Sequence, residues 1–510
     1  MNPNKSTAAS RYSALSVARN SVLEKARQAS RLTIPGLIPE IGQNEHYSPT
    51  QPYQSAGAHG LRSLSARLLS TLFPTSVQFF RLELDAFAAA QLQADKNDVD
   101  TRLSQVAETT AAMMDDLKVR PALAEVIKQL IAAGNVVAYL PQDRAPRVYR
   151  IDQFVLKRDN YGQFTDIIIQ EKVWPSTLPE AVRTALGVKL DPNTDEKQID
   201  VYTVVEQRDG KVTHWQEIEG KVVPNSKSDA IPTDQAGWLA PRWTVVPGSD
   251  YGRSHITEYL GDLLSMEDNY KAITQFAAIA SRVVTVVNPN SSLDVAELAA
   301  AESGDYIYGE LEAIGTVGLN KSQDFAVIKD VTATIEARIK EAFLVANYRD
   351  AERVTAEEIR SQSEELENGL GGTFSVLASE LQQPIAARYL YVAAQRKLIP
   401  PIPEGIRPKI VTGLAALGRA AEVNRLRTFA ADAIQILTPQ VFAGLINAPA
   451  FLSRLGNEHG VSSLETLLKT EEQMAQEQQQ AMAQQAMQAA TPAIAEAAIG
   501  AATQDPNQGT

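Results

Sequence analysis

The stretch SHITEYLGDLLSMEDNYKAITQFAAIASR, residues 254–282, decides the fold because it predicts one long amphipathic helix. Ser254 suits the N-cap position, where its hydroxyl accepts a hydrogen bond from a backbone N–H of the first turn. At about 1.5 Å per residue this helix would be roughly 43 Å long. Its apolar residues fall on one stripe: Ile256, Leu260, Leu263, Tyr270, Ile273, Phe276 and Ala280. A stripe of that length requires a partner helix.

Two more long helices are predicted further along the chain. The third of the series runs from Thr355 to about Lys397, and Thr355 followed by Glu358 forms a capping box at its start. Short β-rich runs and a small helix over 292–302 separate the first helix from the second. The second begins near Asp324 and has its own apolar stripe: Phe325, Ile328, Val331, Ile335, Ile339 and Phe343.

Gly369, Gly371 and Gly372 fall inside the third predicted helix. In a helix interior each glycine costs about 1 kcal/mol relative to alanine, so some other effect must compensate. We interpret the glycines as a helix kink or hinge; the alternatives are close backbone packing and a plain break between two helices. Pro384 predicts a second bend in the same segment.

The first half of the chain combines helices with a small antiparallel sheet. After Gly134 the apolar period changes to two, and turns at Asp159 to Gly162 and at Asp209-Gly210 predict two β-hairpins. Helices are predicted before that point, over 11–32, 55–73 and about 121–133. The fold class is therefore α+β, mainly α.

Composition limits the classes of function. The 510 residues include no cysteine, which excludes disulfides and thiolate chemistry and favours a reducing cytosol. The net charge of −13 has the wrong sign for a protein whose whole surface grips nucleic acid. The N-terminus lacks the pattern of a secretory signal, and no apolar run is long enough to span a bilayer, so we expect no membrane partner.

The motifs of common enzymes are missing. GTVGLNKS, residues 315–322, lacks the glycine that a phosphate-binding loop has immediately before its lysine. The acidic residues show no two-metal pattern and are interpreted as solvated charge. The histidines never occur at metal-ligand spacing: His46, His59, His214, His255 and His459. The sequence predicts no catalytic residue, no metal site and no cofactor.

Several longer strings resemble one known family, the portal or head-to-tail connector proteins of short-tailed double-stranded DNA bacteriophages. The order of a long helix, a β-rich insert, a second long helix, a loop and a kinked third helix is similar to the core of that family. The resemblance covers about residues 15–420. The strings that carry it are TIPGLIPE (33–40), YQSAGAHGLRSLSARLLSTLFP (53–74), LIAAGNVVAYLP (130–141), SDYGRSHITEYLGDL (249–263) and RVTAEEIRSQSEELENGLGGTFSVLASELQQP (353–384).

The resemblance implies a division of the chain along the family's pattern. In this division the end of the Ala/Gln-rich tail is expected to be disordered. The segments are a wing over 1–250, with N-terminal helices and antiparallel hairpins; a stem helix over 251–282; a clip over 283–323; a second stem helix over 324–347; a tunnel loop over 346–355; a kinked wing helix and the start of a crown over 356–425; and the crown and tail over 426–510.

The resemblance also implies a non-enzymatic ring, usually of twelve subunits, at one capsid vertex. Viral DNA would be packaged and ejected through its centre. Twelve helices about 10 Å wide, arranged in a circle, leave an opening of about 28 Å, through which a duplex passes. The implied location is the head-tail vertex of the virion, after assembly in the host cytoplasm. The implied partners are further copies of the chain, viral DNA, the terminase large subunit, tail adaptor and nozzle proteins, and scaffold, major capsid and internal core proteins.

Arg349 and Arg353 lie in the implied tunnel loop, where they would touch DNA phosphates without reading bases. The alternative is an ion pair between subunits, with Glu352 or a neighbouring acid. Weaker candidates for DNA contact lie on the two stem helices: Lys271, Arg338 and Lys340. An acidic lining that keeps phosphates from sticking to the wall is expected from Asp350, Glu352, Glu357 and Glu358.

Two other classes of function stay open at this point. The first is a DNA-packaging enzyme, an ATPase or nuclease, which would need phosphate-binding and metal-binding residues that the sequence does not display. The second is a tail adaptor or scaffold protein without a channel. An ATPase assay separates the first from a portal, and an image of a central hole separates the second.

Overall fold

The computed structural model describes two units of the chain, residues 1–417 and 418–510. In the second unit the described helical residues are 428–436, 441–442, 445 and 451–452. The described residues of the whole chain are 7–42, 48–75, 78–84, 96–187, 197–280, 284–288, 290, 294–302, 306, 314–317, 322–344, 365–366, 368–370, 372–400, 408–412, 428–437, 441–442, 445–446 and 451–452.

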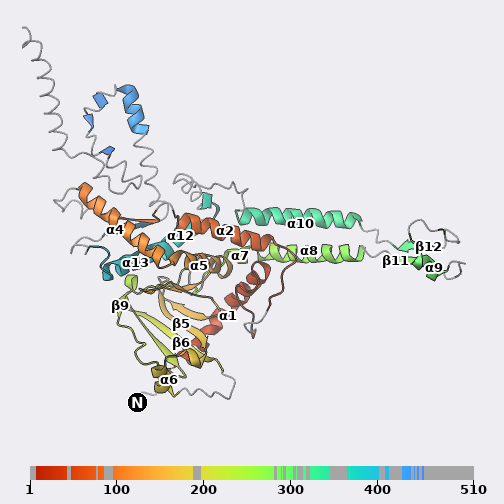
Figure 1. Cartoon of the computed structure of the whole chain (residues 1–510), viewed down its shortest axis with the longest axis horizontal. Helices are drawn as coiled ribbons and strands as arrows, with labels where there is room; N and C mark the ends of the chain where they lie inside the picture. The colour runs from red at the N-terminus through yellow and green to blue at the C-terminus, as the bar shows by residue number, and fades with distance from the viewer. Residues whose placement is uncertain are drawn as a thin grey trace, which may run out of the picture. The chain divides into compact units, whose positions relative to one another are not determined.

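Helices dominate the first unit (Figure 1). The α-helices are α1 (Ala8–Leu32), α2 (Ala56–Leu72), α4 (Lys96–Asp116), α5 (Val119–Ala133), α6 (Glu180–Leu186), α7 (His255–Glu258), α8 (Leu260–Ala280), α9 (Val295–Ala300), α10 (Ser322–Ala342), α12 (Thr373–Leu377) and α13 (Gln383–Gln395). Shorter turns are 3₁₀ at Pro175–Thr177 and Thr233–Gln235, and π-helical at Ala378–Gln382.

The strands form one larger sheet and three small ones. The larger sheet has the order β4-β5-β6-β7-β8, with β9 also paired to β7. The strands are β1 (Phe80–Leu84), β2 (Val137–Tyr139), β3 (Arg147–Tyr149), β4 (Phe154–Arg158), β5 (Phe164–Val173), β6 (Ile199–Arg208), β7 (Lys211–Ile218), β8 (Lys221–Val222), β9 (Ile231–Pro232), β10 (Trp238–Leu239), β11 (Val284–Val287), β12 (Ile314–Val317) and β13 (Pro408–Thr412).

The two predicted hairpins are confirmed. Strands β4 and β5 pair antiparallel around the turn that contains Gly162, and β6 and β7 pair antiparallel around Asp209 and Gly210. Both residues of the second turn have positive φ, 51° and 71°, which is the backbone of a type I′ hairpin turn.

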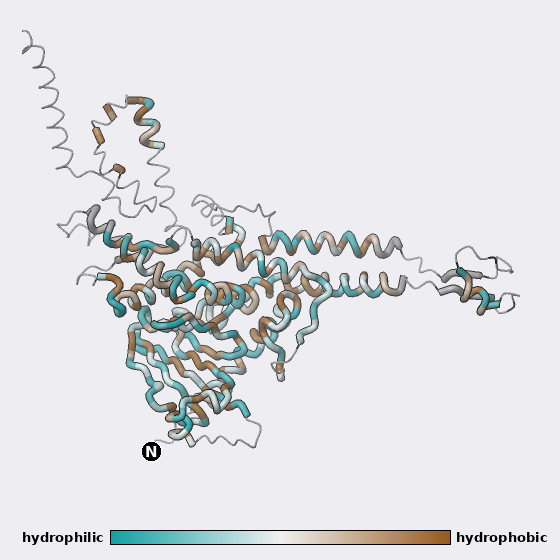
Figure 2. Tube along the Cα trace, in the orientation of Figure 1, coloured by the Kyte–Doolittle hydropathy of each residue, from teal (hydrophilic) through white to brown (hydrophobic). Residues whose placement is uncertain are grey.

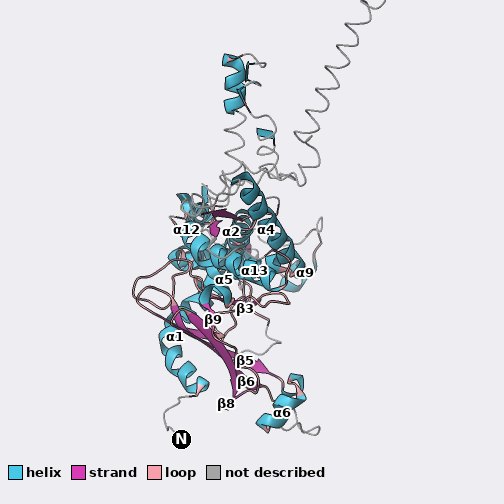
Figure 3. Ribbon diagram, turned by 90° about the vertical axis from the view of Figure 1, so that its left-hand side faces the viewer, coloured by secondary structure: helices cyan, strands magenta, loops and turns pink. Residues whose placement is uncertain are grey.

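Both faces of the larger sheet are covered. Figure 3 shows α1 beside the strands, and Tyr12 of α1 packs against Val155, Ile168 and Val204. The residues that alternate with these along the strands, including Ile167 and Val205, belong to a second cluster on the opposite face. Because successive side chains are buried on opposite faces of the sheet, the sequences of these strands are nearly continuous apolar runs.

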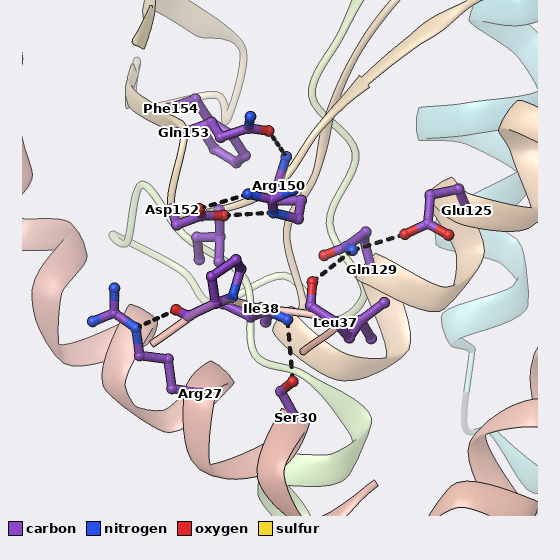
Figure 4. Close-up of polar contacts among 12 residues, drawn as sticks. Arg27, Ser30, Leu37, Ile38, Glu125, Gln129, Arg150, Asp152, Gln153 and Phe154 are labelled. Carbon is purple, nitrogen blue, oxygen red and sulfur yellow. Dashed lines mark hydrogen bonds and ion pairs between the residues drawn. The ribbon is translucent and has the colours of Figure 1, made fainter. Parts of the chain in front are cut away.

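A polar link fixes the chain where it turns back after α1 (Figure 4). The Ser30 hydroxyl accepts a hydrogen bond from Ile38 N at 3.1 Å, and Arg27 Nε donates to Pro39 O at 3.0 Å. From α5, Gln129 Nε2 donates to Leu37 O at 3.4 Å. The segment after α1 is thereby tied both to α1 and to α5, two helices that lie far from each other in the sequence.

The main hydrophobic core joins the first and the last thirds of this unit. It contains residues of α2, α5, α10, α12 and α13, so residues 1–250 share one core with later helices. Polar ties follow the same route: Gln382 Nε2 donates to Leu72 O, and Arg388 Nε donates to Leu140 O. The pairing of β1 with β13 adds a contact between strands more than 300 residues apart, which the sequence pattern does not predict.

The single helices predicted over 251–282 and 355–397 are both interrupted. The first is α7 and α8, separated at Tyr259, whose φ of −110° and ψ of 14° leave the helical region. Ser254 caps α7 as predicted, since its hydroxyl accepts from Thr257 N at 3.1 Å. In the second, Gly372 has φ of 87° and starts α12, so the described part shows a break between helices at this glycine.

Around Pro384 the helix continues, because the π-turn Ala378–Gln382 comes directly before it. Proline has no N–H to donate, and it lies in the first turn of α13, where that donor is not needed. In the described part of the chain, no helix combines the length and the apolar character needed to cross a membrane.

Candidate functional site

The α8 and α10 helices pack side by side, as the sequence predicts for two matching apolar stripes (Figure 1). Each has 21 residues. Nearest the main core, apolar residues of both helices are buried, because i, i+3 and i+4 spacing sets them on one face. These residues are Leu263, Met266, Ile335, Ile339 and Phe343.

Other apolar side chains of the pair are exposed. Val327 and Val331, one turn apart on α10, are 64% and 48% exposed, and Leu264 on α8 is 44% exposed. The tube in Figure 2 shows hydrophobic and hydrophilic residues mixed along both helices. The prediction that Val331 packs against the partner helix is wrong within a single chain. Thr332 takes the buried position instead, and its hydroxyl donates to Ile328 O at 2.7 Å.

Polar contacts hold the two helices together across their exposed edges. Arg338 of α10 forms an ion pair with Asp262 of α8 at 3.0 Å, and the Tyr270 hydroxyl donates to Glu336 at 3.1 Å. Lys340 forms an ion pair with Glu336 at 2.9 Å, and its hydrogen bond lowers the pKa of the Glu336 carboxyl below the ordinary value. Pairs this exposed contribute little stability, but they fix side-chain positions.

These contacts differ among the three basic residues that were predicted to contact DNA from these helices, Lys271, Arg338 and Lys340. Arg338 and Lys340 both have acidic partners in their own chain, with side chains 57% and 54% exposed. Lys271 is exposed and forms no ion pair among the described residues. Of the three, Lys271 is the most available for an external anion.

The other nominated residues lie mostly outside the described residues. Gly369 is described, and a Cβ there would lie 2.9 Å from Leu344 Cδ2, so the absence of a side chain permits a close approach. Gly372 occupies the break described above. The nominated residues outside the described part are Arg349, Asp350, Glu352, Arg353, Glu357, Glu358 and Gly371.

The end of α10 is anchored by residues that the sequence pattern does not single out. Phe343 is fully buried, and a Cβ at Gly60 of α2 would lie 2.6 Å from its ring, so only glycine fits there. His255 Nε2 lies 2.9 Å from the carbonyl oxygen of Ala342, and the His255 ring contacts the Phe343 ring edge to face at 5.4 Å. Three short segments from distant parts of the chain therefore meet where α10 ends.

Burial lowers the pKa of His255 below its ordinary value of 6.5, although the hydrogen bond to Ala342 opposes this shift. The unfolded chain therefore binds this proton more readily than the folded chain. We expect the free energy of unfolding to be level above about pH 6.5 and to fall below it, by up to about 1.4 kcal/mol per pH unit for each such group. His214 adds to the fall, because burial and then Arg388 lower its pKa as well.

Urea unfolding of His255→Gln between about pH 7.5 and pH 5.5 tests this expectation. Glutamine keeps a donor for Ala342 but does not titrate, so the fall at low pH should be shallower than in the parent protein. His59→Gln replaces an exposed histidine and should leave the pH dependence unchanged. Identical pH dependence in His255→Gln and the parent protein would show that His255 is not responsible.

A cavity of about 380 Å³ opens where α2 meets the α8 and α10 pair, between Tyr53, His59, Tyr270 and Lys340. Lys340 is already paired with Glu336, which also lines it. Among the described residues no three histidine, aspartate or glutamate side chains are arranged to hold a metal ion.

Comparison with known proteins assigns the chain to a family. The family model described as bacteriophage head to tail connecting protein matches residues 5–464. The portal protein of Enterobacteria phage T3 is 34% identical over 476 residues, covering 91% of this chain and 88% of the relative. That of Escherichia phage T7 is 34% identical over 495 residues, covering 94% and 92%.

The portal protein of Pseudomonas phage phiKMV is 29% identical over 501 residues, covering 94% of this chain and 95% of the relative. The residues that the family model matches, 5–464, include the sheet, the main core and the α8 and α10 pair. The resemblance read from the sequence strings is thereby confirmed. The chain belongs to the family of bacteriophage head to tail connecting proteins.

Proposed function

We propose that copies of this chain close into a ring, of twelve subunits, at one vertex of a phage capsid, and that viral DNA enters and leaves through its centre. The family match over residues 5–464 carries this proposal. The exposed flank of Val327 and Val331 supports it, because covering these two side chains with another chain would remove their apolar area from water. The covering chain is a second copy, since each subunit of a ring presents the same flank to its neighbour.

We propose the division of the chain that the resemblance implies. We assign the stem to α8 and α10, the clip to 283–323 with β11, α9 and β12, and the tunnel loop to 346–355. The wing then consists of residues 1–250 with the kinked helix from 356 onward, and residues 426–510 form the crown and tail. Since the wing and that helix share one hydrophobic core, they are expected to move as one body.

For DNA contact we propose Arg349 and Arg353 in the tunnel loop, with Lys271 on the stem ahead of the paired Arg338 and Lys340. Phosphate contacts of this kind guide a duplex without reading its sequence. An acidic lining from Asp350, Glu352, Glu357 and Glu358 would prevent tight binding, because like charges repel the phosphates. The net charge of −13 is consistent with a conduit that holds DNA loosely.

The proposed partners follow from this position. During assembly in the host cytoplasm the ring would contact scaffold, major capsid and internal core proteins, and the terminase large subunit would dock at the clip. Tail adaptor and nozzle proteins would replace the motor after packaging. The ATPase belongs to the motor chain, so the purified connector is expected to hydrolyse no ATP.

Assembly of heads with and without the protein tests the proposal. Cells that express all other head and packaging proteins should yield DNA-filled heads only when this chain is supplied. Empty heads should accumulate without it. DNA-filled heads in its absence, or ATP hydrolysis by the purified chain, would favour a scaffold role or an enzyme over a portal.

A further inference from the structure

One guanidinium group contacts the chain on both sides of the segment 345–364. Arg67 of α2 donates from one terminal nitrogen to the carbonyl oxygen of Leu344, just beyond the end of α10. Its other terminal nitrogen forms an ion pair with Glu365 at 3.0 Å. Leu344 and Glu365 are the described residues nearest to the two ends of that segment.

Water has only partial access to the ion pair between Arg67 and Glu365. The Arg67 side chain is 11% exposed and the Glu365 side chain is 53% exposed, so the arginine end is almost completely enclosed. The carbonyl of Leu344 follows a helix end, where carbonyl oxygens have no partner within the helix. Leu344 also has φ of 51°, a left-handed backbone that a leucine adopts only when its surroundings hold it there.

Apolar contacts bring the same two chain ends together. Leu344 lies close enough to Gly369 that a Cβ on this glycine would be 2.9 Å away from its side chain. Leu366, one residue after Glu365, is fully buried in the main core. On the α2 side, Gly60 accommodates the Phe343 ring two helical turns before Arg67. One face of α2 therefore receives both ends of the segment.

The geometry requires arginine. A guanidinium has donors fixed in a planar fork and reaches a carbonyl oxygen and a carboxylate at the same time, whereas a lysine ammonium is one mobile point charge. Because one guanidinium on α2 contacts both residues, it fixes how far Leu344 lies from Glu365.

We propose that Arg67 is a positioning residue that fixes the distance between the two ends of the segment 345–364. This inference rests on the proposed function for its consequence, since that function places the segment at the DNA channel. Without the arginine, Leu344 and Glu365 would lose their common partner and would separate more readily. The ring itself would still assemble.

Hydrogen exchange of the full-length protein tests the structural part. In Arg67→Gln, amides just before residue 345 and just after residue 364 should both exchange about tenfold faster, the size of effect expected for a lost charge-assisted hydrogen bond. Arg67→Lys should give a smaller acceleration. Glu365→Gln should accelerate amide exchange just after residue 364 more than amide exchange just before residue 345. Arg62→Gln is the matched control, because Arg62 is exposed on the same helix.

DNA retention tests the consequence. Heads built with Arg67→Gln should contain fewer full-length genomes than heads built with the parent protein, while the subunit number and thermal midpoint of the ring match those of the parent. If Arg67 only stabilised the fold, Arg67→Gln would change the thermal midpoint of the ring, and DNA retention would change in proportion to that midpoint. Unchanged exchange at either end, equal effects of Arg62→Gln, or normal retention despite faster exchange would each overturn the proposal.

Failure of the proposed function gives a different result. In that case the parent protein would be dispensable for DNA-filled heads, while the exchange comparison at the two chain ends would still stand. Should Arg67→Gln fail to fold, Glu365→Gln decides, because an exposed carboxylate can be neutralised without loss of the core. Faster exchange after residue 364 in that variant supports the contact, and no change contradicts it.

Discussion

Replacing both Val327 and Val331 with aspartate is expected to abolish ring assembly and leave a folded monomer. In the single chain both side chains are exposed, so the charges stay in water and cost little. In the proposed ring they would be covered by the neighbouring copy. Burying an unpaired carboxylate costs several kcal/mol, and the cost recurs at every subunit contact. Sedimentation velocity should show only the monomer.

The control is Val17→Asp, which introduces one aspartate at a valine of α1 that is 74% exposed. This variant should assemble like the parent protein. Val327→Thr with Val331→Thr should weaken assembly without abolishing it, because threonine keeps the shape and removes only part of the apolar surface. Rings of normal size from the double aspartate variant would place the subunit contact elsewhere.

Phe343→Ala is expected to lower the free energy of unfolding by about 3–5 kcal/mol. The ring of Phe343 is fully buried, and it packs against Gly60, which has no side chain to move into the space. The cavity should therefore persist. The loss also removes the edge-to-face contact with His255 that supports the end of α10. Urea unfolding followed by circular dichroism measures the change.

Two comparisons define the origin of this loss. Phe343→Leu keeps most of the volume and should cost clearly less than alanine. Leu398→Ala removes a similar apolar side chain that is 49% exposed and should cost little. A loss for Phe343→Ala no larger than that for Leu398→Ala would mean that the end of α10 is not anchored in the core.

Local patterns in the sequence were sufficient to predict most of the described helices and both hairpins. The hairpin turns could be predicted because Asp209 and Gly210 are residue types that adopt positive φ. The break at Tyr259 could not be predicted, since the helix-disfavouring residue nearby, Gly261, lies inside α8 and not at the break. The pairing of β1 with β13 depends on contacts between remote segments, which periodicity does not report.

In the candidate site, too, sequence patterns could not predict which residues meet in the folded chain. Apolar spacing predicted that the two stem helices need partners, but it assigned Val331 to the buried face that Thr332 occupies. A threonine satisfies its own hydroxyl within the helix, so a buried polar position looks no different from an exposed one in the sequence. Arg67 and Gly60 were missed because their partners lie almost 300 residues away. The string around α2 that resembles the family was the only signal in that region.

An averaged top view of the purified, unmodified protein by electron microscopy tests the central claim most directly. Closure through the exposed flanks of α10 predicts a ring with a central opening of about 28 Å, the value for twelve helices each about 10 Å wide. A particle without a central hole, or single chains only, would contradict it.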